Sequence, residues 1–222
     1  MDPWLAVPPL AAAIAYFSKG LDWLSAITGA IMGYMVLFLG GWQWLAILIL
    51  FFALSTAATH YKYGLKAEYR VSQKKRTVEN VLGNGLAPLI FAMQGNVYGF
   101  AASMATATAD TLSSEIGVLS KKPPVSILDF KTEMKRGDNG GVTTLGNTAM
   151  LCGASAIALA CLAFYGSWQL FWITLWSSIF GCVVDSVLGA TLENERIIGN
   201  HVVNFLATLS GGLFAIALST IT

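Results

Sequence analysis

The chain is 222 residues long, 55% hydrophobic and only 11% charged, with a mean hydropathy of +0.64. Soluble domains are roughly one-quarter charged, so this composition excludes an ordinary soluble domain, and its apolar content excludes a disordered or collagen-like chain. The net charge of +1 gives no basis for nucleic-acid binding. Three cysteines, Cys152, Cys161 and Cys182, lie singly in apolar runs and predict neither a disulfide framework nor a zinc site. The sequence predicts an integral membrane protein.

Apolar segments along the chain indicate about eight transmembrane helices, because a helix needs about 17 to 25 apolar residues to cross the hydrocarbon layer. Gly40 and Gly41 predict a tight hairpin between the second and third segments, and Asn84 and Pro88 predict that the fourth is broken or half-length. The segments are Trp4–Ser18, Trp23–Gly40, Trp42–Ala58, Val81–Met93, Val97–Leu119, Val142–Phe164, Gln169–Ala190 and Val202–Ile221. We therefore expect an all-α, polytopic membrane protein with a single transmembrane domain over residues 1–222.

The basic residues are sorted between the two sides of the predicted membrane. All 13 Lys and Arg residues follow the first, third, fifth or seventh segment, and the connections near Gly41, Gly95 and Gly166 contain none. The positive-inside rule then predicts both termini outside and cytoplasmic loops at about 59–79, 120–141 and 191–200. The first segment lacks the flanks of a removable signal peptide. In a prokaryote the expected location is the plasma membrane.

Three carboxylates, Asp110, Glu115 and Asp185, fall in the cytoplasmic halves of predicted helices. A charge inside a span costs at least about 2.5 kcal/mol, so such residues usually line a polar cavity. Asparagines spaced four apart begin the fourth and eighth segments: Asn80, Asn84, Asn200 and Asn204. Amides of this kind can simply join helices by hydrogen bonds. The convergence of several polar groups at one depth favours a functional site at the cytoplasmic face.

The connection Lys131–Gly146 contains Lys135, Arg136 and the pair Gly140-Gly141 just before the sixth segment. Glycines before a helix N-terminus let backbone N–H groups approach an anion, although a plain turn also explains them. The spacing is neither a Walker A loop nor a dinucleotide fingerprint. Beside carboxylates that can hold Mg²⁺, this loop indicates a polyphosphate ligand.

The basic segment 62–76 has two expected roles. Lys62, Lys66 and Arg70 are assigned to anionic lipid headgroups, which attract basic residues beside a membrane. Lys75 and Arg76, close to the first asparagine pair, are expected to face a substrate.

Five motifs in order resemble the phytyl-phosphate kinase family, which includes the transmembrane protein 19 group. They are Asn80–Gly85, Ala109–Gly117, Asp138–Thr143, Asp185–Ala190 and Asn200–Asn204. That family is distantly similar to dolichol kinases, phytol kinases and CDP-diacylglycerol synthases. The resemblance implies an enzyme of isoprenoid metabolism, a metal-dependent kinase that transfers phosphate from CTP or another nucleoside triphosphate to an isoprenyl monophosphate, such as phytyl phosphate.

The resemblance also implies roles for individual residues. The catalytic residues and ligands of one or two Mg²⁺ ions are expected to be Asp110, Glu115 and Asp185. The nucleotide and phosphate ligands are expected to be Lys75, Arg76, Lys135, Arg136, Asp138, Asn139, Gly140 and Gly141. The residues that orient the acceptor are expected to be Asn80, Asn84, Ser114, Glu193, Asn200 and Asn204. The expected partners are the lipid bilayer, the prenyl phosphate and the nucleotide, with no nucleic acid, and the sequence is compatible with a homodimer.

Two alternative functions stay open. A cytidylyltransferase that makes a CDP-lipid would use the same residue types, and its product would be pyrophosphate instead of CDP. A transporter would also suit intramembrane carboxylates and short helices. It is the weaker alternative, because the outer halves of the predicted helices are nearly free of polar residues.

Overall fold

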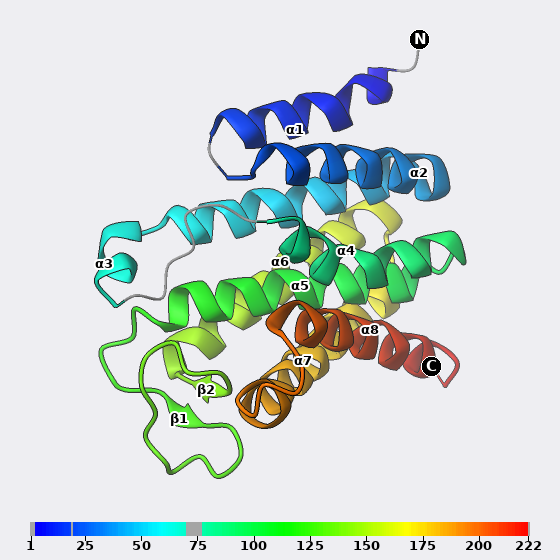
Figure 1. Ribbon diagram of the computed structural model, residues 1–222. Coiled ribbons are helices and arrows are strands. Elements are labelled where there is room, and N and C mark those ends of the chain that lie inside the picture. The colour runs from blue at the N-terminus through cyan, green and yellow to red at the C-terminus, as the bar shows by residue number, and fades with distance from the viewer. Residues whose placement is uncertain (1–2, 19, 70–76, 222) are drawn as a thin grey trace.

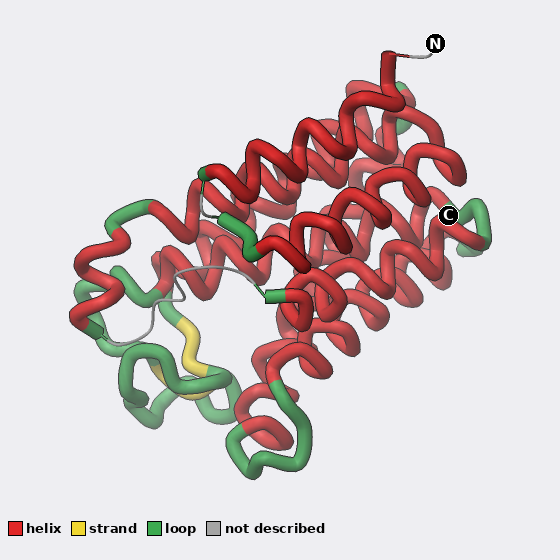
Figure 2. Tube along the Cα trace, turned by 45° about the horizontal axis from the view of Figure 1, so that its top comes forward, coloured by secondary structure: helices red, strands yellow, loops and turns green. Residues whose placement is uncertain are grey.

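The computed structural model describes residues 3–18, 20–69 and 77–221, and these form a bundle of helices running up and down a common axis (Figures 1 and 2). The helices are α1 (Val7–Phe17, after the 3₁₀ turn Pro3–Ala6), α2 (Trp23–His60), α3 (Tyr63–Glu68), α4 (Val78–Met93), α5 (Val97–Gly117), α6 (Thr144–Tyr165), α7 (Trp168–Leu188) and α8 (Asn200–Ser219). A π-helical turn, η2 (Gly189–Glu193), extends α7. Two short strands, β1 (Val125–Ser126) and β2 (Gly141–Val142), pair antiparallel. The all-α prediction is confirmed.

The predicted hairpin near Gly41 is present. Helix α2 is interrupted at Gly41, whose φ of 79° and ψ of −173° are not helical, and the chain doubles back there (Figure 1). The turns at Gly95 and Gly166 also use a left-handed glycine, with φ of 65° and 64°. A residue with a Cβ avoids this backbone region, so glycine is the natural choice for reversing the chain in so few residues.

The membrane assignment is confirmed at the level of fold class. Among the described residues, four helices are long and apolar enough to cross a membrane: Trp23–His60, Thr144–Tyr165, Trp168–Glu193 and Asn200–Ser219. The apolar helices Pro3–Phe17 and Val78–Met93 are shorter. The second of these, α4, is short, as predicted. It is not broken, because the helix continues through Pro88. The total of eight spans and their orientation stay predictions.

Helix α5 occupies the centre of the bundle, packed against α2, α4, α6, α7 and α8. Its first two-thirds is almost entirely buried and consists largely of Ala, Ser, Thr and Gly. Small side chains let neighbouring backbones approach closely, as at helix contacts in membranes. Gly153 of α6 lies against the backbone of Ala109, and Gly181 of α7 and Gly211 of α8 both lie against Thr106. A helix enclosed by others needs no lipid-facing apolar surface, which explains its many hydroxyl groups.

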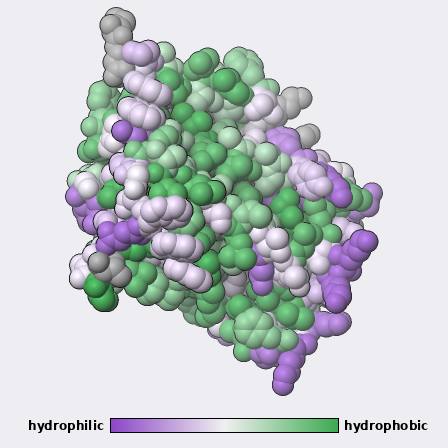
Figure 3. Space-filling model, turned by 180° about the vertical axis from the view of Figure 1, so that it is seen from behind, coloured by the Kyte–Doolittle hydropathy of each residue, from purple (hydrophilic) through white to green (hydrophobic). Residues whose placement is uncertain are grey.

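The two ends of the bundle differ in character. We call the end that carries residues 61–69 and the connections 118–143 and 189–199 the loop end. Helix α1 begins and α8 finishes at the opposite end, beside the glycine turns (Figure 1). Large hydrophilic groups gather along the loop end, next to a broad hydrophobic surface over the helices (Figure 3). Hydrophilic groups are therefore concentrated at one end of the bundle, in agreement with the distribution of basic residues along the sequence.

The contact between α5 and α8 gives a stability prediction. An added Cβ at Gly211 would collide with Oγ1 of Thr106 and lie 3.1 Å from the carbonyl oxygen of Ser177. We expect Gly211→Ala to lower the free energy of unfolding by about 1–3 kcal/mol, the usual cost of overpacking. The matched control is Gly29→Ala, because no heavy atom lies within 4 Å of a Cβ added at Gly29. Thermal denaturation in detergent measures both, and equal melting temperatures would contradict the packing described.

Candidate functional site

A cavity of about 870 Å³ opens at the loop end, between α4, α5, α6, α7 and α8 and beneath the 118–143 segment. Its volume falls in the range of about 300–1,000 Å³ that is typical of ligand sites. Many residues predicted from sequence line it: Asn80, Asn84, Asp110, Ser114, Glu115, Arg136, Asp138, Asn139, Gly140, Gly141, Asp185, Glu193, Asn200 and Asn204. Lys135 is not among the lining residues, and Lys75 and Arg76 lie outside the described residues.

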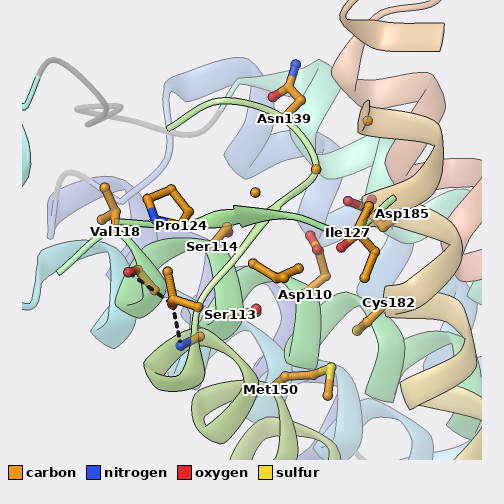
Figure 4. Close-up of a pocket in the computed structure, with 18 of the residues that line it drawn as sticks. Asp110, Ser113, Ser114, Val118, Pro124, Ile127, Asn139, Met150, Cys182 and Asp185 are labelled. Carbon is orange, nitrogen blue, oxygen red and sulfur yellow. Dashed lines mark hydrogen bonds between the residues drawn. The ribbon is translucent and has the colours of Figure 1, made fainter. Parts of the chain in front are cut away.

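Asp110 of α5 and Asp185 of α7 face each other in this cavity (Figure 4). Their positions follow from the packing one turn earlier, where Thr106 of α5 lies against Gly181 of α7. The two helices run in the same direction (Figure 1), and residues four apart share a helix face. Close contact between Thr106 and Gly181 therefore also brings together the residues one turn later, Asp110 and Asp185. The two carboxyl groups lie close enough to interact directly.

The carboxylate pair has an unsatisfied atom. Oδ2 of Asp185 is buried and has no hydrogen-bond partner among the described residues. A buried oxygen of this kind is costly unless a ligand or cation completes its contacts. Mg²⁺ is commonly held in nucleotide sites by one or two carboxylates together with water and phosphate oxygens. Asp110 and Asp185 fit that requirement.

The predicted set of three carboxylates is not assembled. In the described part of the chain, no group of three or more His, Cys, Asp or Glu side chains is placed to hold a metal ion. Glu115 lines the cavity wall but forms an ion pair with Lys66, with 2.6 Å between Oε2 and Nζ. Its Oε1 accepts a hydrogen bond of 2.9 Å from Oγ1 of Thr59. The carboxylate of Glu115 is thus engaged by α2 and α3, and the expectation that it ligates metal is corrected.

The expectation that Lys66 binds lipid headgroups is also wrong. Lys66 is fully buried, and its ammonium group donates to the carbonyl oxygens of Ala58 and Thr59 at 2.8 and 2.7 Å as well as to Glu115. These carbonyls belong to the last turn of α2, where no helical donor reaches them. Lys66 therefore caps α2 and joins it to α5.

The glycine pair before α6 has a packing role. Gly140 has a φ of 79°, and an added Cβ would collide with Ala190 in η2. Gly141 pairs with Ser126 in the β1–β2 ladder. Helix α6 begins at Thr144, with Thr143 as its N-cap accepting a 2.9 Å hydrogen bond from the N–H of Gly146. The pair thus brings the 118–143 segment against α7 while the N-terminus of α6 faces the cavity.

The charged residues of this segment mostly shape the loop itself. Arg136 donates to the carbonyl oxygens of Val118, at 2.9 Å, and Ser120, just beyond the C-terminus of α5. Asp138 accepts a 3.0 Å hydrogen bond from the N–H of Lys135, which closes a turn. Hydrogen bonds from Oγ1 of Thr132 and from nearby backbone N–H groups hold the pKa of Asp129 below its usual value. The predicted phosphate-binding role of Arg136 therefore competes with a structural role.

The four asparagines line the cavity wall at the beginnings of α4 and α8. Glu193, at the end of the π-helical turn, forms hydrogen bonds with the side chains of Asn200 and Asn139. The side chain of Asn194 donates to the carbonyl oxygen of Asn139 at 3.2 Å. Asn200, Asn139 and Glu193 thus form one polar network that joins the loop to α8. π-Helical turns frequently occur at functional sites.

Several cavity residues were assigned no role from the sequence: Ser113, Lys122, Thr143, Asn147 and Ser186. Asn147 lies four residues after Thr143, the N-cap of α6, so like the other asparagines it lies near the beginning of a helix. Lys122 follows α5 in an irregular segment, where no periodicity marks it. Its position depends on how the loop folds.

Comparisons with known proteins agree with the membrane assignment. A family model described as integral membrane protein DUF92 matches residues 6–212. "Uncharacterized membrane protein MJ0933" of Methanocaldococcus jannaschii is 32% identical over 205 residues, which cover 90% of this chain and 86% of that protein. "Protein PGR" of Arabidopsis thaliana is 28% identical over 229 residues, covering 84% and 77% of the two chains. "Uncharacterized membrane protein sll0875" of Synechocystis is 26% identical over 205 residues, covering 85% and 78%. No solved structure matches the chain.

The Lys66–Glu115 pair gives a second stability prediction. Lys66→Met removes the cation and leaves the carboxylate of Glu115, whose side chain is 20% exposed, without its partner. We expect a loss of roughly 3 kcal/mol in the free energy of unfolding, as for other buried pairs broken on one side. Lys66→Met/Glu115→Gln should recover part of that loss, because no carboxylate is then left unpaired. Denaturation of the single and double variants in detergent measures the coupling. A lipid-binding Lys66 would instead give additive losses that depend on anionic lipid.

Proposed function

The chain belongs to the integral membrane protein DUF92 family, and we propose that it is a metal-dependent phosphotransferase that phosphorylates an isoprenyl monophosphate to the diphosphate, using CTP or another nucleoside triphosphate. The observation that carries this proposal is the Asp110–Asp185 pair, with its unsatisfied oxygen, at a cavity in the end of a membrane helix bundle. A water-soluble donor can enter such a cavity from the loop end, while a lipid-linked acceptor approaches from the bilayer.

Asp110 and Asp185 would hold Mg²⁺, which when bound neutralises charge on the transferring phosphates. The cation would also give Oδ2 of Asp185 the partner that it lacks among the described residues. The first turns of α4, α6 and α8 line the cavity through Asn80, Thr143 and Asn200. Backbone N–H groups at helix N-termini favour anions, so these three turns suit phosphate oxygens.

The chemistry needs no activated side-chain nucleophile. An oxygen of the acceptor monophosphate is already ionised and attacks the γ-phosphorus of the donor, forming a P–O bond. The bond from that phosphorus to the β,γ-bridging oxygen breaks, and the electron pair leaves on the nucleoside diphosphate. Asn84 and Asn204 line the same cavity as the carboxylate pair and are assigned to orient the acceptor phosphate. Lys122, also in the wall, supplies a cation for the donor phosphates.

The direct test of this proposal is a turnover assay with purified protein, labelled CTP, Mg²⁺ and a panel of prenyl monophosphates. We expect CDP and a prenyl diphosphate as products. Asp110→Ala and Asp185→Ala should each lower kcat by at least about 100-fold, the scale of single electrostatic contacts to a transition state. Release of pyrophosphate would identify a cytidylyltransferase instead. Full activity in both variants would overturn the assigned roles.

Mg²⁺ binding can be tested without turnover. At a concentration about 100-fold above its Kd, the ion should raise the melting temperature of the wild-type protein by roughly 5 °C or more. Asp185→Asn should abolish this rise, and it should stabilise the metal-free protein because it removes one of two facing carboxylates. Asp129→Asn is the control, since the carboxylate of Asp129 is exposed and does not line the cavity. An unchanged Mg²⁺ response in Asp185→Asn would exclude this pair as the metal site.

A further inference from the structure

A second, apolar cavity adjoins the first. It has a volume of about 110 Å³ and lies between α1, α2 and α4, with Met104 of α5 in its wall. Its lining is almost wholly aliphatic and aromatic, with Asn80 as the polar exception. An apolar cavity of roughly 150 Å³ accommodates a molecule the size of benzene and stays dry. This space therefore suits a short stretch of hydrocarbon.

Helix α4 forms a wall common to both cavities. Asn84 lines the polar cavity, Val81 and Gly85 line the apolar one, and Asn80 lines both. Both cavities thus border the first turns of α4 and share Asn80 as a lining residue. A molecule with a polar head beside Asn84 and an apolar chain beside Val81 would contact α4 along this shared wall.

Small residues leave this space open. Alanines of α1 and glycines of α2 line it, including Ala11, Ala12 and Gly29. These three residues are partly exposed, so the space reaches the molecular surface that faces the bilayer in the predicted topology. No heavy atom lies within 4 Å of a Cβ added at Gly29, although Gly33 and Gly85 in the same wall are tightly packed against Pro8 and Met32. Gly29 therefore borders the open part of the groove.

We propose that this groove binds the part of the isoprenyl chain nearest the acceptor phosphate, while the remainder of the chain extends into the bilayer. The proposal rests on the proposed function of the polar cavity, because it needs a lipid phosphate whose head lies there. Asn80 lines both cavities, which favours the acceptor over a bulk phospholipid. In the proposed reaction the phosphate of the acceptor must lie in the polar cavity, so its chain must begin beside that residue. The small volume favours a thin chain with single methyl branches.

The test is a variant whose new side chain occupies the open part of the groove. Gly29→Leu places an apolar side chain where the structure has free space, so the protein should fold normally. We expect kcat/KM for geranylgeranyl phosphate to fall at least about tenfold, with kcat/KM for methyl phosphate, which has no chain, unchanged. The matched control is Gly64→Leu in α3, a helical glycine that also has no neighbour within 4 Å of an added Cβ and lines neither cavity. Equal kinetics in Gly29→Leu and wild type would overturn the groove assignment.

A second measurement separates this proposal from the phosphotransferase activity. Geranylgeranyl phosphate with a diazirine on its first isoprene unit is cross-linked to the wild-type protein, and labelled peptides are identified by mass spectrometry. Label on the groove walls of α1, α2 or α4 that Gly29→Leu abolishes supports the groove even if no turnover is detected, in which case only the proposed activity fails. Absence of label there, or equal competition by a diazirine-free phosphatidylcholine, overturns the groove assignment.

Discussion

The close packing of five helices around α5 is the constraint on which the rest of the structure depends. Because α5 presents Ala, Ser, Thr and Gly on nearly every side, its neighbours approach at backbone distance and cannot slide without collision. Thr106 is the clearest case, because a glycine of α7 and a glycine of α8 both lie against its side chain. Its hydroxyl group donates to the carbonyl oxygen of Ala102, so it also satisfies its own polar atom within α5.

The site inherits its geometry from this packing. Asp110 and Asp185 lie one turn beyond the Thr106–Gly181 contact on two helices with the same direction. Two carboxyl groups repel when both are ionised, so in that state the scaffold must hold them together. Such an arrangement is costly without a cation, and natural proteins retain costly polar groups in membrane helices mainly at functional positions. The packing of α5 thus links the stability of the fold to the proposed chemistry.

The same end of the bundle also holds an ion pair that stabilises the fold and is not assigned to the chemistry. Lys66 and Glu115 form an ion pair, and Lys66 also donates to two buried carbonyl oxygens at the end of α2. Glu115 follows Asp110 by five residues, which corresponds to about 140° around a helix of 3.6 residues per turn. Both carboxylates of α5 line the cavity, but their side chains therefore leave the helix in different directions. One is directed to α7 and the site, and the other to α2 and α3.

The sequence by itself determined the class, the approximate helices and the chain reversals. Hydropathy reports the lipid environment directly, and a glycine in a two- or three-residue connection reports a backbone that other residues avoid. It also marked Asp110 and Asp185, because a carboxylate in an apolar run is costly wherever the run packs. Only the tertiary structure decided that Lys66 is buried, that Glu115 is its partner, and that Gly140 packs against Ala190. These pairings join residues distant in the sequence. They depend on how helices rotate and approach one another, which local periodicity does not specify.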